Sequence, residues 1–207
     1  MLQYVTDASA KRSVEDQIKD VLSAGCNWIT IDPAGMSDED VKSLVNNIMP
    51  ACLEKQAFLL IKGRTELAKE ANVGGVVVGE GDDTPSHARL TLGAAAVVGV
   101  EVSSTQEIDR LIGLDVDYVV MPFKPLGADG VKELCRYMEQ KEMELPRVAA
   151  EGVGYDDIAT LMDAGCNGVA MSESLADADD IAAETEKAIK LLKTFEEKEL
   201  AKLKEQY

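Results

Sequence analysis

Positive charge, histidine and long apolar runs are all scarce in this sequence of 207 residues. No apolar run approaches the roughly 18 residues that a membrane span requires. The N-terminus also lacks the basic and apolar segments of a secretory signal. Lysine and arginine number 21 against 38 aspartates and glutamates, for a net charge of −17. Nucleic acids and anionic membranes bind through positive patches, so we expect neither as a partner.

Cysteine and aromatic residues are also few. The four cysteines, Cys26, Cys52, Cys135 and Cys166, are widely spaced and form no C-x-x-C pair. This pattern predicts buried free thiols and a reducing, cytoplasmic location. Aromatic residues make up only 4% of the chain, so aliphatic side chains must supply most of the core. The length suits one large domain or two small ones.

Short β-branched runs alternate with amphipathic segments along the chain. Several runs are almost continuously apolar, as are parallel strands covered on both faces. The amphipathic segments carry helix start signals, such as Ser37 before three acids. The expected strands are 2–6, 27–32, 57–62, 74–79, 96–102, 117–122, 146–152 and 168–172. The expected helices are 13–24, 37–53, 64–71, 84–92, 104–112, 127–142, 155–164 and 178–203.

Eight strand–helix units predict the α/β class and a single (β/α)8 TIM barrel, which removes both sheet edges. An open doubly wound sheet is the competing architecture. That fold usually carries a glycine-rich phosphate turn after its first strand, and residues 5–13 contain no glycine. The segments "SAGCNWI" (23–29) and "DAGCNGV" (163–169) repeat one helix-to-strand turn, as equivalent barrel units would. We therefore prefer the closed barrel.

The C-terminal segment prolongs the last helical pattern. We assign residues 1–193 to the barrel and 194–207 to a C-terminal helical extension. Leu192, Phe195 and Leu203 form an apolar stripe beside Glu/Lys pairs. The stripe is interpreted as packing on the barrel, and a homodimer contact is the alternative.

Five segments, in one order, carry a resemblance to a known family. They are "LQYVTD", "GVVVGEGDDTPSHAR", "VVGVEVSSTQEI", "DVDYVV" and "AGCNGVAMSESL". Over roughly residues 2–192 the chain resembles the thiamine phosphate synthase/TenI family. The resemblance implies a (β/α)8 barrel. It also implies a transferase that joins hydroxymethylpyrimidine pyrophosphate to thiazole phosphate, with Mg²⁺ holding the pyrophosphate.

Most residues that this family uses to hold its substrates are replaced. At the end of the second strand the family's Gln-x-Arg-x-Lys pattern reads Thr30, Asp32 and Ala34. An aspartate therefore stands where the resemblance implies a phosphate-binding arginine. The third strand ends in Lys62-Gly63 in place of Asn-Asp, which removes one magnesium carboxylate.

A few positions keep the family's residues. Asp82 matches the second metal carboxylate, and the adjacent Asp83 is a further candidate ligand for Mg²⁺. Gly152 and Ser172 match the cradle that binds thiazole phosphate through backbone N–H groups. Lys124 is the lone cation of the short segment after the sixth strand, and we expect it to contact phosphate.

Acids follow most of the expected strands. Active sites of (β/α)8 barrels lie at the carboxyl ends of the strands. We expect Asp32, Glu80, Glu101 and Glu151 to form an acidic mouth there, with Glu151 and Glu173 flanking the phosphate cradle. Such a mouth repels phosphate and attracts cations. Two interpretations stay open: a site for a divalent cation or an amine, or acids that accumulated after a catalytic site was lost.

The substitutions predict a synthase-like barrel without most of the synthase site. We expect a non-catalytic or re-purposed protein that binds a small molecule or a cation. The alternative is an active synthase in which Lys62 or Lys124 replaces the missing cations. A third interpretation is a structural partner of another pathway protein that uses the outer helices and the C-terminal extension. His87, the only histidine, is expected on a helix surface after the fourth strand.

Overall fold

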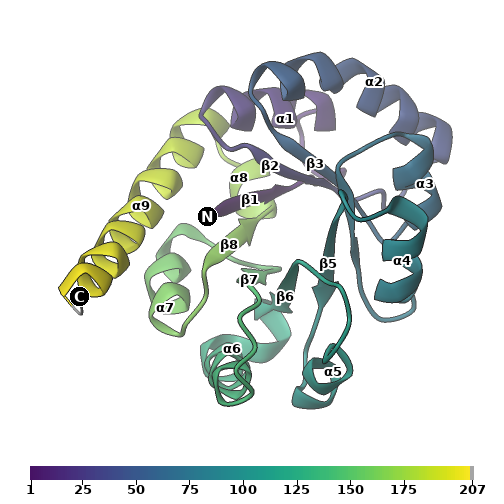
Figure 1. The fold of residues 1–207 in the computed structure, drawn as a ribbon. Helices are drawn as coiled ribbons and strands as arrows, with labels where there is room; N and C mark the ends of the chain where they lie inside the picture. The colour runs from purple at the N-terminus through teal and green to yellow at the C-terminus, as the bar shows by residue number, and fades with distance from the viewer. Residues whose placement is uncertain (206–207) are drawn as a thin grey trace.

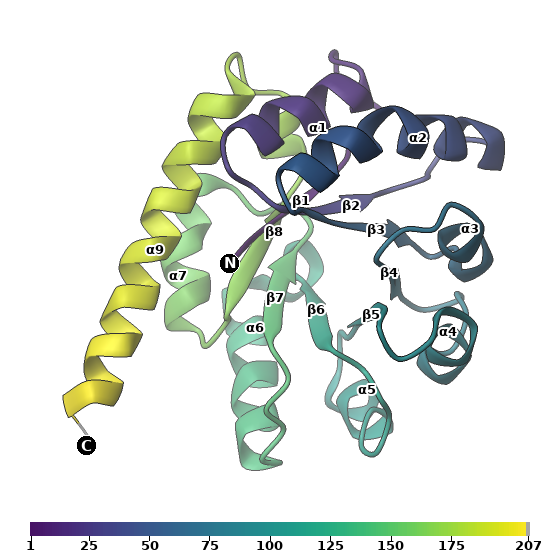
Figure 2. The same ribbon diagram turned by 45° about the horizontal axis from the view of Figure 1, so that its top comes forward.

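The strands form a closed barrel in which all neighbours are parallel and β1 pairs with both β2 and β8. The computed structural model describes residues 1–205, and for residues 199, 202, 203 and 205 it describes the backbone only. Helices surround the barrel on all sides (Figures 1 and 2). The strands are β1 (Leu2–Val5), β2 (Trp28–Ile31), β3 (Phe58–Lys62), β4 (Gly75–Val78), β5 (Val97–Glu101), β6 (Tyr118–Pro122), β7 (Arg147–Ala150) and β8 (Gly168–Met171).

Each expected strand is confirmed, and each is followed by at least one helix. The helix expected at 155–164 is divided into the 3₁₀ helix η1 (Tyr155–Asp157) and the helix α7 (Ile158–Asp163), and the short helix α8 (Glu173–Ala176) was not expected. The other helices are α1 (Val14–Ser23), α2 (Asp38–Glu54), α3 (Thr65–Glu70), α4 (Pro85–Leu92), α5 (Thr105–Arg110), α6 (Phe123–Gln140) and α9 (Ile181–Glu205).

Side-chain caps determine where several helices begin. Ser13, Ser37, Thr84 and Ser104 each accept a hydrogen bond from the backbone N–H three residues further on. Such a cap contributes about 1 kcal/mol by satisfying a donor that has no partner within the helix. The cap expected at Ser37 is confirmed.

Helix α6 begins earlier than the sequence indicates. A first turn forms from Phe123, and Gly127 then interrupts it with φ 66° and ψ 175°. Only glycine adopts that conformation readily, so it produces a kink between two helical pieces. The expected helix at 127–142 corresponds to the second piece.

The repeated helix-to-strand turn is confirmed in the structure. Gly25 and Gly165 have φ of 92° and 107°. After each glycine, the amide of the cysteine donates to a carbonyl five residues earlier, at 3.0 Å for Cys26 and 3.2 Å for Cys166. Both turns therefore end the helix with the same glycine-dependent motif and lead into β2 and β8.

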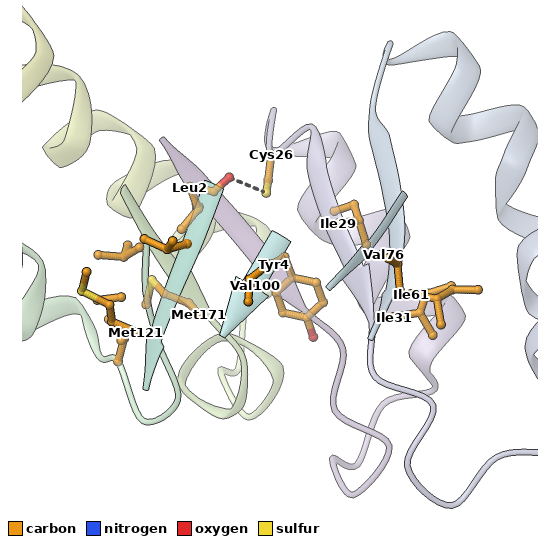
Figure 3. Close-up of a cluster of buried hydrophobic side chains, with 14 of the residues drawn as sticks. Leu2, Tyr4, Cys26, Ile29, Ile31, Ile61, Val76, Val100, Met121 and Met171 are labelled. Atoms are coloured by element: carbon orange, nitrogen blue, oxygen red, sulfur yellow. Dashed lines mark hydrogen bonds between the residues drawn. The ribbon is translucent and has the colours of Figure 1, made fainter. Parts of the chain in front are cut away.

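The core has two layers, because successive strand residues point to opposite faces. Leu59 and Ile61 pack against the helices, whereas Leu60 lies inside the barrel. Figure 3 shows part of the outer layer, including Ile29 and Ile31. All four cysteines are buried and free, as expected. The inner layer consists of Leu60, Val77, Tyr118, Val120, Val148, Ala150 and Ala170.

Tyr118 fills the interior of the barrel next to Gly99. A Cβ at position 99 would lie 2.5 Å from ring carbons of Tyr118, which is closer than such atoms approach. Tyr118 is 1% exposed and its ring also contacts Trp28, with centroids 5.4 Å apart. The glycine therefore provides the space that the tyrosine occupies.

The Gly99→Ala variant tests this packing. We expect its free energy of unfolding to fall by about 1–3 kcal/mol, because a rigid buried ring must shift to admit one methyl group. Urea denaturation would measure the change. The control is Ala159→Gly on α7, which removes one methyl group at a partly exposed helical position. An unchanged midpoint for Gly99→Ala would contradict the packing argument.

Helix α9 lies along one side of the barrel beside α7 (Figures 1 and 2). It packs on α1 and α7 and runs without interruption across the proposed boundary at residues 193 and 194. Leu192 is buried and Phe195 is half-buried, while the side chain of Leu203 lies outside the described part. None of the helices within residues 1–205 is long and apolar enough to span a membrane.

Candidate functional site at the carboxyl ends of the strands

A cavity of about 300 Å³ opens at the carboxyl ends of the barrel strands. Its lower wall is apolar and its rim is charged. Of the residues expected at the mouth or in the phosphate cradle, six line it: Asp32, Glu101, Lys124, Glu151, Gly152 and Ser172. The remaining lining residues are Gln3, Val5, Thr30, Lys62, Val77, Val120, Ala150, Ala170 and Glu173.

Lys62 lines the charged rim and contacts acids that follow or end two other strands. It is the last residue of β3, and its Nζ lies 2.8 Å from Glu101 Oε1 at the end of β5. A second carboxylate, Glu151 Oε1, lies 3.5 Å away. The lysine therefore joins two of the predicted mouth acids, and the mouth is less negative than the acids alone suggest.

The surroundings of Lys62 keep it protonated. Burial lowers the pKa of Lys62. The hydrogen bond to Glu101 and the nearby acidic charges raise it by more than burial lowers it, so the pKa lies above its usual value. The charges belong to Glu101, Glu151 and Asp32. A protonated amine is not a nucleophile. Lys62 is thus a fixed positive charge that holds the rim together, and not a candidate for carbonyl chemistry.

Glu151 holds its position at a conformational cost. Its φ is +63°, in the left-handed region where a side chain costs about 1–2 kcal/mol. Its carbonyl accepts a hydrogen bond from Lys124 N at 3.0 Å. The next residue, Gly152, has φ 75°, and a Cβ there would lie 3.2 Å from Lys124 Cβ. The turn after β7 is therefore suited to two glycines, and one of the two positions carries an acid.

Glu101 also depends on a glycine. A Cβ on Gly79, at the end of β4, would collide with the Glu101 carboxylate. Because Gly79 has no side chain, the Glu101 carboxylate can lie against the end of β4 and reach Lys62.

The floor of the cavity contains a buried carboxamide. Gln3 Nε2 donates to Thr30 Oγ1 at 2.7 Å and to Tyr118 OH at 3.0 Å. Gln3 and Thr30 are each 2% exposed. Within residues 1–205 the other amide atom, Gln3 Oε1, has no hydrogen bond. Burial raises the pKa of Tyr118 to about 12, so its hydroxyl remains neutral at physiological pH.

The turn after β4 lies outside the cavity, contrary to the expected acidic mouth. Glu80 and Asp83 line a separate groove beside α5. Asp83 Oδ1 lies 3.2 Å from Nδ1 of His87, which is exposed on α4 as expected. Glu80 is not among the residues that line the cavity, and it lies in the turn between Gly79 and Gly81.

Asp82 has a structural role in the same turn. Its Oδ2 accepts a hydrogen bond from Gly79 N at 2.8 Å, and its carboxylate fits against Gly63, which has no side chain. In the described part of the chain no cluster of three or more histidine, cysteine or acidic side chains is arranged to hold a metal ion. One oxygen of Asp82 is thus committed to the turn, and Gly63 stands where the family resemblance implies a second carboxylate.

Arg64, two residues beyond Lys62, does not contribute its charge to the cavity. Its guanidinium donates to the carbonyls of Pro33 and Met36, at 3.2 Å each, and to Asp38 Oδ1 at 2.7 Å. It therefore anchors the loop that follows β2, and Lys62 and Lys124 are the cations among the cavity's lining residues.

Sequence reasoning did not identify Gln3 as part of the site. The available signal was a glutamine within the apolar strand segment "LQYV", at the same inward parity as Val5. A buried polar residue in such a strand usually has a specific partner. The partners, Thr30 and Tyr118, come from strands distant in sequence, so this pattern alone could not identify them.

The closed parallel barrel and the position of its cavity define the molecule as a (β/α)8 protein with its site at the usual pole. The family described as thiamine monophosphate synthase matches residues 2–175, and the chain belongs to this family. The predicted family resemblance and the predicted fold are both confirmed.

Individual relatives match over nearly their whole length. The chain is 30% identical over 201 residues to the thiamine-phosphate synthase of Bacteroides thetaiotaomicron, covering 92% of this chain and 96% of that protein. It is 28% identical to the thiamine-phosphate synthase of Bacteroides fragilis strain YCH46, with 92% and 98% covered. The solved thiamine phosphate pyrophosphorylase of Pyrococcus furiosus shares the fold, with a TM-score of 0.83 and 19% identity over 94% of this chain and 96% of that one.

Proposed function

We propose that this protein is a small-molecule-binding member of the thiamine monophosphate synthase family that does not catalyse the synthase reaction. The observation that carries the proposal is the position of Lys62. This lysine is held by carboxylates from β5 and from the turn after β7, at 2.8 and 3.5 Å. An incoming pyrophosphate must replace both contacts before it gains the lysine.

The rest of the rim also opposes a phosphorylated substrate. Glu151 and Glu173 flank Gly152 and Ser172, the residues that the family resemblance assigns to phosphate, and all four line one cavity. Asp32 lines it too, at the position where the resemblance implies an arginine. Two like charges about 4 Å apart repel by about 1 kcal/mol in water and by about 4 kcal/mol near a protein surface.

The residues present do not favour a Mg²⁺ ion that would offset the repulsion between the acidic rim and a pyrophosphate. The family resemblance implies two carboxylates on the metal, and Gly63 stands in place of one of them. Asp82 matches the other carboxylate, and one of its oxygens already accepts a hydrogen bond from Gly79 N–H. Without a metal to neutralise it, the negative rim has only Lys62 and Lys124 to offer a pyrophosphate.

A synthase assay tests the proposal. Hydroxymethylpyrimidine pyrophosphate and thiazole phosphate are incubated with Mg²⁺ and the purified protein, and thiamine phosphate is quantified. We expect a rate equal to that of the sample without protein. The Bacteroides thetaiotaomicron synthase, tested in parallel, shows that the substrates are competent.

An active synthase is the second candidate, and the similarity to curated synthases along nearly the whole chain favours it. In that case Lys124, which has no hydrogen bond or ion pair through its ammonium group within residues 1–205, would supply the cation beside Gly152 and Ser172. Turnover clearly above the sample without protein, and lost on Lys124→Met, would establish this activity and overturn the first proposal.

A further inference from the structure

We infer that the cavity binds a small organic cation without phosphate: a molecule with an apolar body of about one ring, a protonated amine at the rim and a hydrogen-bond donor directed at Gln3. The inference rests on the proposed function and specifies the ligand class of that same site. It combines three independent features, which are the buried floor, the charge of the rim and the size of the cavity.

The floor offers an acceptor without a partner. Gln3 lines the cavity, and its side chain is only 2% exposed. Both of its N–H contacts are to Thr30 and Tyr118, while Oε1 carries no hydrogen bond among the residues described. Oε1 is not one of the buried polar atoms that lack a partner, so it is accessible from the cavity, where a ligand N–H or O–H can donate to it.

The walls above the floor suit an apolar body. Val5, Val77, Val120 and Ala170 are apolar residues of the same cavity lining. Burying a ring against such side chains contributes about 25 cal/mol for each Å² of apolar surface removed from water. A volume of about 300 Å³ is at the lower end of the range for ligand pockets, which favours a single ring over a larger molecule.

The rim has negative charge that the protein leaves uncompensated. Four carboxylates and two lysines line the cavity, for a net charge of −2. Lys62 is committed to Glu101 and Glu151. Asp32 Oδ1 accepts only from Ala34 N, at 2.9 Å, and neither Asp32 nor Glu173 has an ion pair in the described part of the chain. These two acids follow β2 and β8, the strands on either side of β1, and they are the groups that a ligand ammonium would meet.

The occupant is an organic cation and not a metal ion. A divalent ion needs several oxygen ligands converging at 2.0–2.6 Å, and residues 1–205 provide no such cluster. Lys62 at the rim would also repel a compact double charge. A single ammonium on an apolar body can approach Asp32 and Glu173 while its body stays below Lys62.

Isothermal titration calorimetry with matched probes tests the ligand class. The probes compare ligands of different charge. Three carry one ring and differ in charge: benzylamine is a cation, benzyl alcohol is neutral and benzoate is an anion. Inorganic pyrophosphate is an anion without a ring. We expect benzylamine to bind at least tenfold more tightly than benzyl alcohol, and benzoate and pyrophosphate to bind least. 4-Aminobenzylamine adds an N–H donor on the ring, and we expect about a fivefold further gain that Gln3→Leu removes.

Three charge variants locate the binding. Asp32→Asn and Glu173→Gln should each weaken benzylamine binding about fivefold, the effect of one charge pair near a surface, and leave benzyl alcohol unchanged. Glu80→Gln removes the same charge from an acid outside the cavity and should leave both probes unchanged. Thermal unfolding of each variant shows that it remains folded.

Several results would overturn the inference. Equal binding of benzylamine and benzyl alcohol, tighter binding of benzoate or pyrophosphate, or an equal loss for Glu80→Gln would each exclude a cation site at this rim. The synthase assay is independent of these titrations. If the protein makes thiamine phosphate and also prefers benzylamine to benzyl alcohol, only the proposed function is contradicted. If it makes no thiamine phosphate and binds the two probes equally, only the ligand class is contradicted.

Discussion

The Lys62→Met variant should unfold with a free energy about 1–3 kcal/mol lower than the native chain at neutral pH. Removing the lysine leaves Glu101, Glu151 and Asp32 around one opening without their central counter-charge. Truncating one partner of a partly buried ion pair costs more than the pair contributes, because the remaining charge is left unpaired. Methionine keeps most of the side chain's apolar length, so the loss measures charge and not volume.

The pH dependence of this difference identifies its origin. The folded protein raises the pKa of Lys62 above its usual 10.5. The stabilisation by Lys62 is therefore fully present below pH 10.5 and is lost as the pH rises through the folded pKa. Urea denaturation of both proteins should show a constant difference from neutral pH up to about pH 10 that shrinks at higher pH.

Lys190→Met is the matched control for Lys62→Met. Lys190 pairs with Glu186 on α9 at 3.5 Å, and its side chain is 77% exposed. An exposed pair contributes at most about 0.5 kcal/mol within a helix, so we expect a small change. If Lys62→Met lost no more stability than Lys190→Met, the central role of Lys62 in the rim would be excluded.

Replacing the two acids beside the phosphate cradle should have the largest effect on ligand preference. The double variant Glu151→Gly, Glu173→Ala changes the charge of the cavity lining from −2 to zero and releases Lys62 from one of its two acids. We expect pyrophosphate to bind at least tenfold more tightly than to the native protein, a change of about 1.4 kcal/mol. Isothermal titration calorimetry at low ionic strength measures it.

The same double variant should fold normally. Glycine at position 151 relieves the left-handed strain of about 1–2 kcal/mol, and this gain offsets the entropy that glycine adds to the unfolded chain, about 0.5–1 kcal/mol. The variant Glu80→Ala, Glu144→Ala removes two exposed charges away from the cavity and controls for net charge. Equal gains in pyrophosphate affinity for both double variants would show that overall charge, and not the rim, limits binding.

Local patterns were sufficient to predict the barrel. A strand such as 57–62 is apolar along its length because both of its faces are covered, and this depends on neighbouring residues in the sequence alone. The same holds for the capped helix start at Ser37 and for the two turns at Gly25 and Gly165. The helical turn before Gly127 was missed, because the sequence pattern places the start of the helix at Gly127 itself.

The composition of the site could be predicted only in part. Acids at the ends of successive strands predict a charged mouth, and Asp32, Glu101 and Glu151 do line the cavity. Glu80 follows β4 in the same way but points into another groove. The direction of a side chain in a turn depends on the backbone path of that turn, and the positions of Gly79 and Gly81 did not reveal it.

The sequence by itself determined the family, the order of strands and helices, and the excess of acids at one pole of the barrel, because each follows from local pattern and composition. Only the tertiary structure decided how those acids are used. Lys62 and Glu151 are 89 residues apart in sequence, and only closure of the barrel brings their side chains together. Charge in a folded site depends on which groups the strand register places in contact, and a count of residues along the chain does not contain that information.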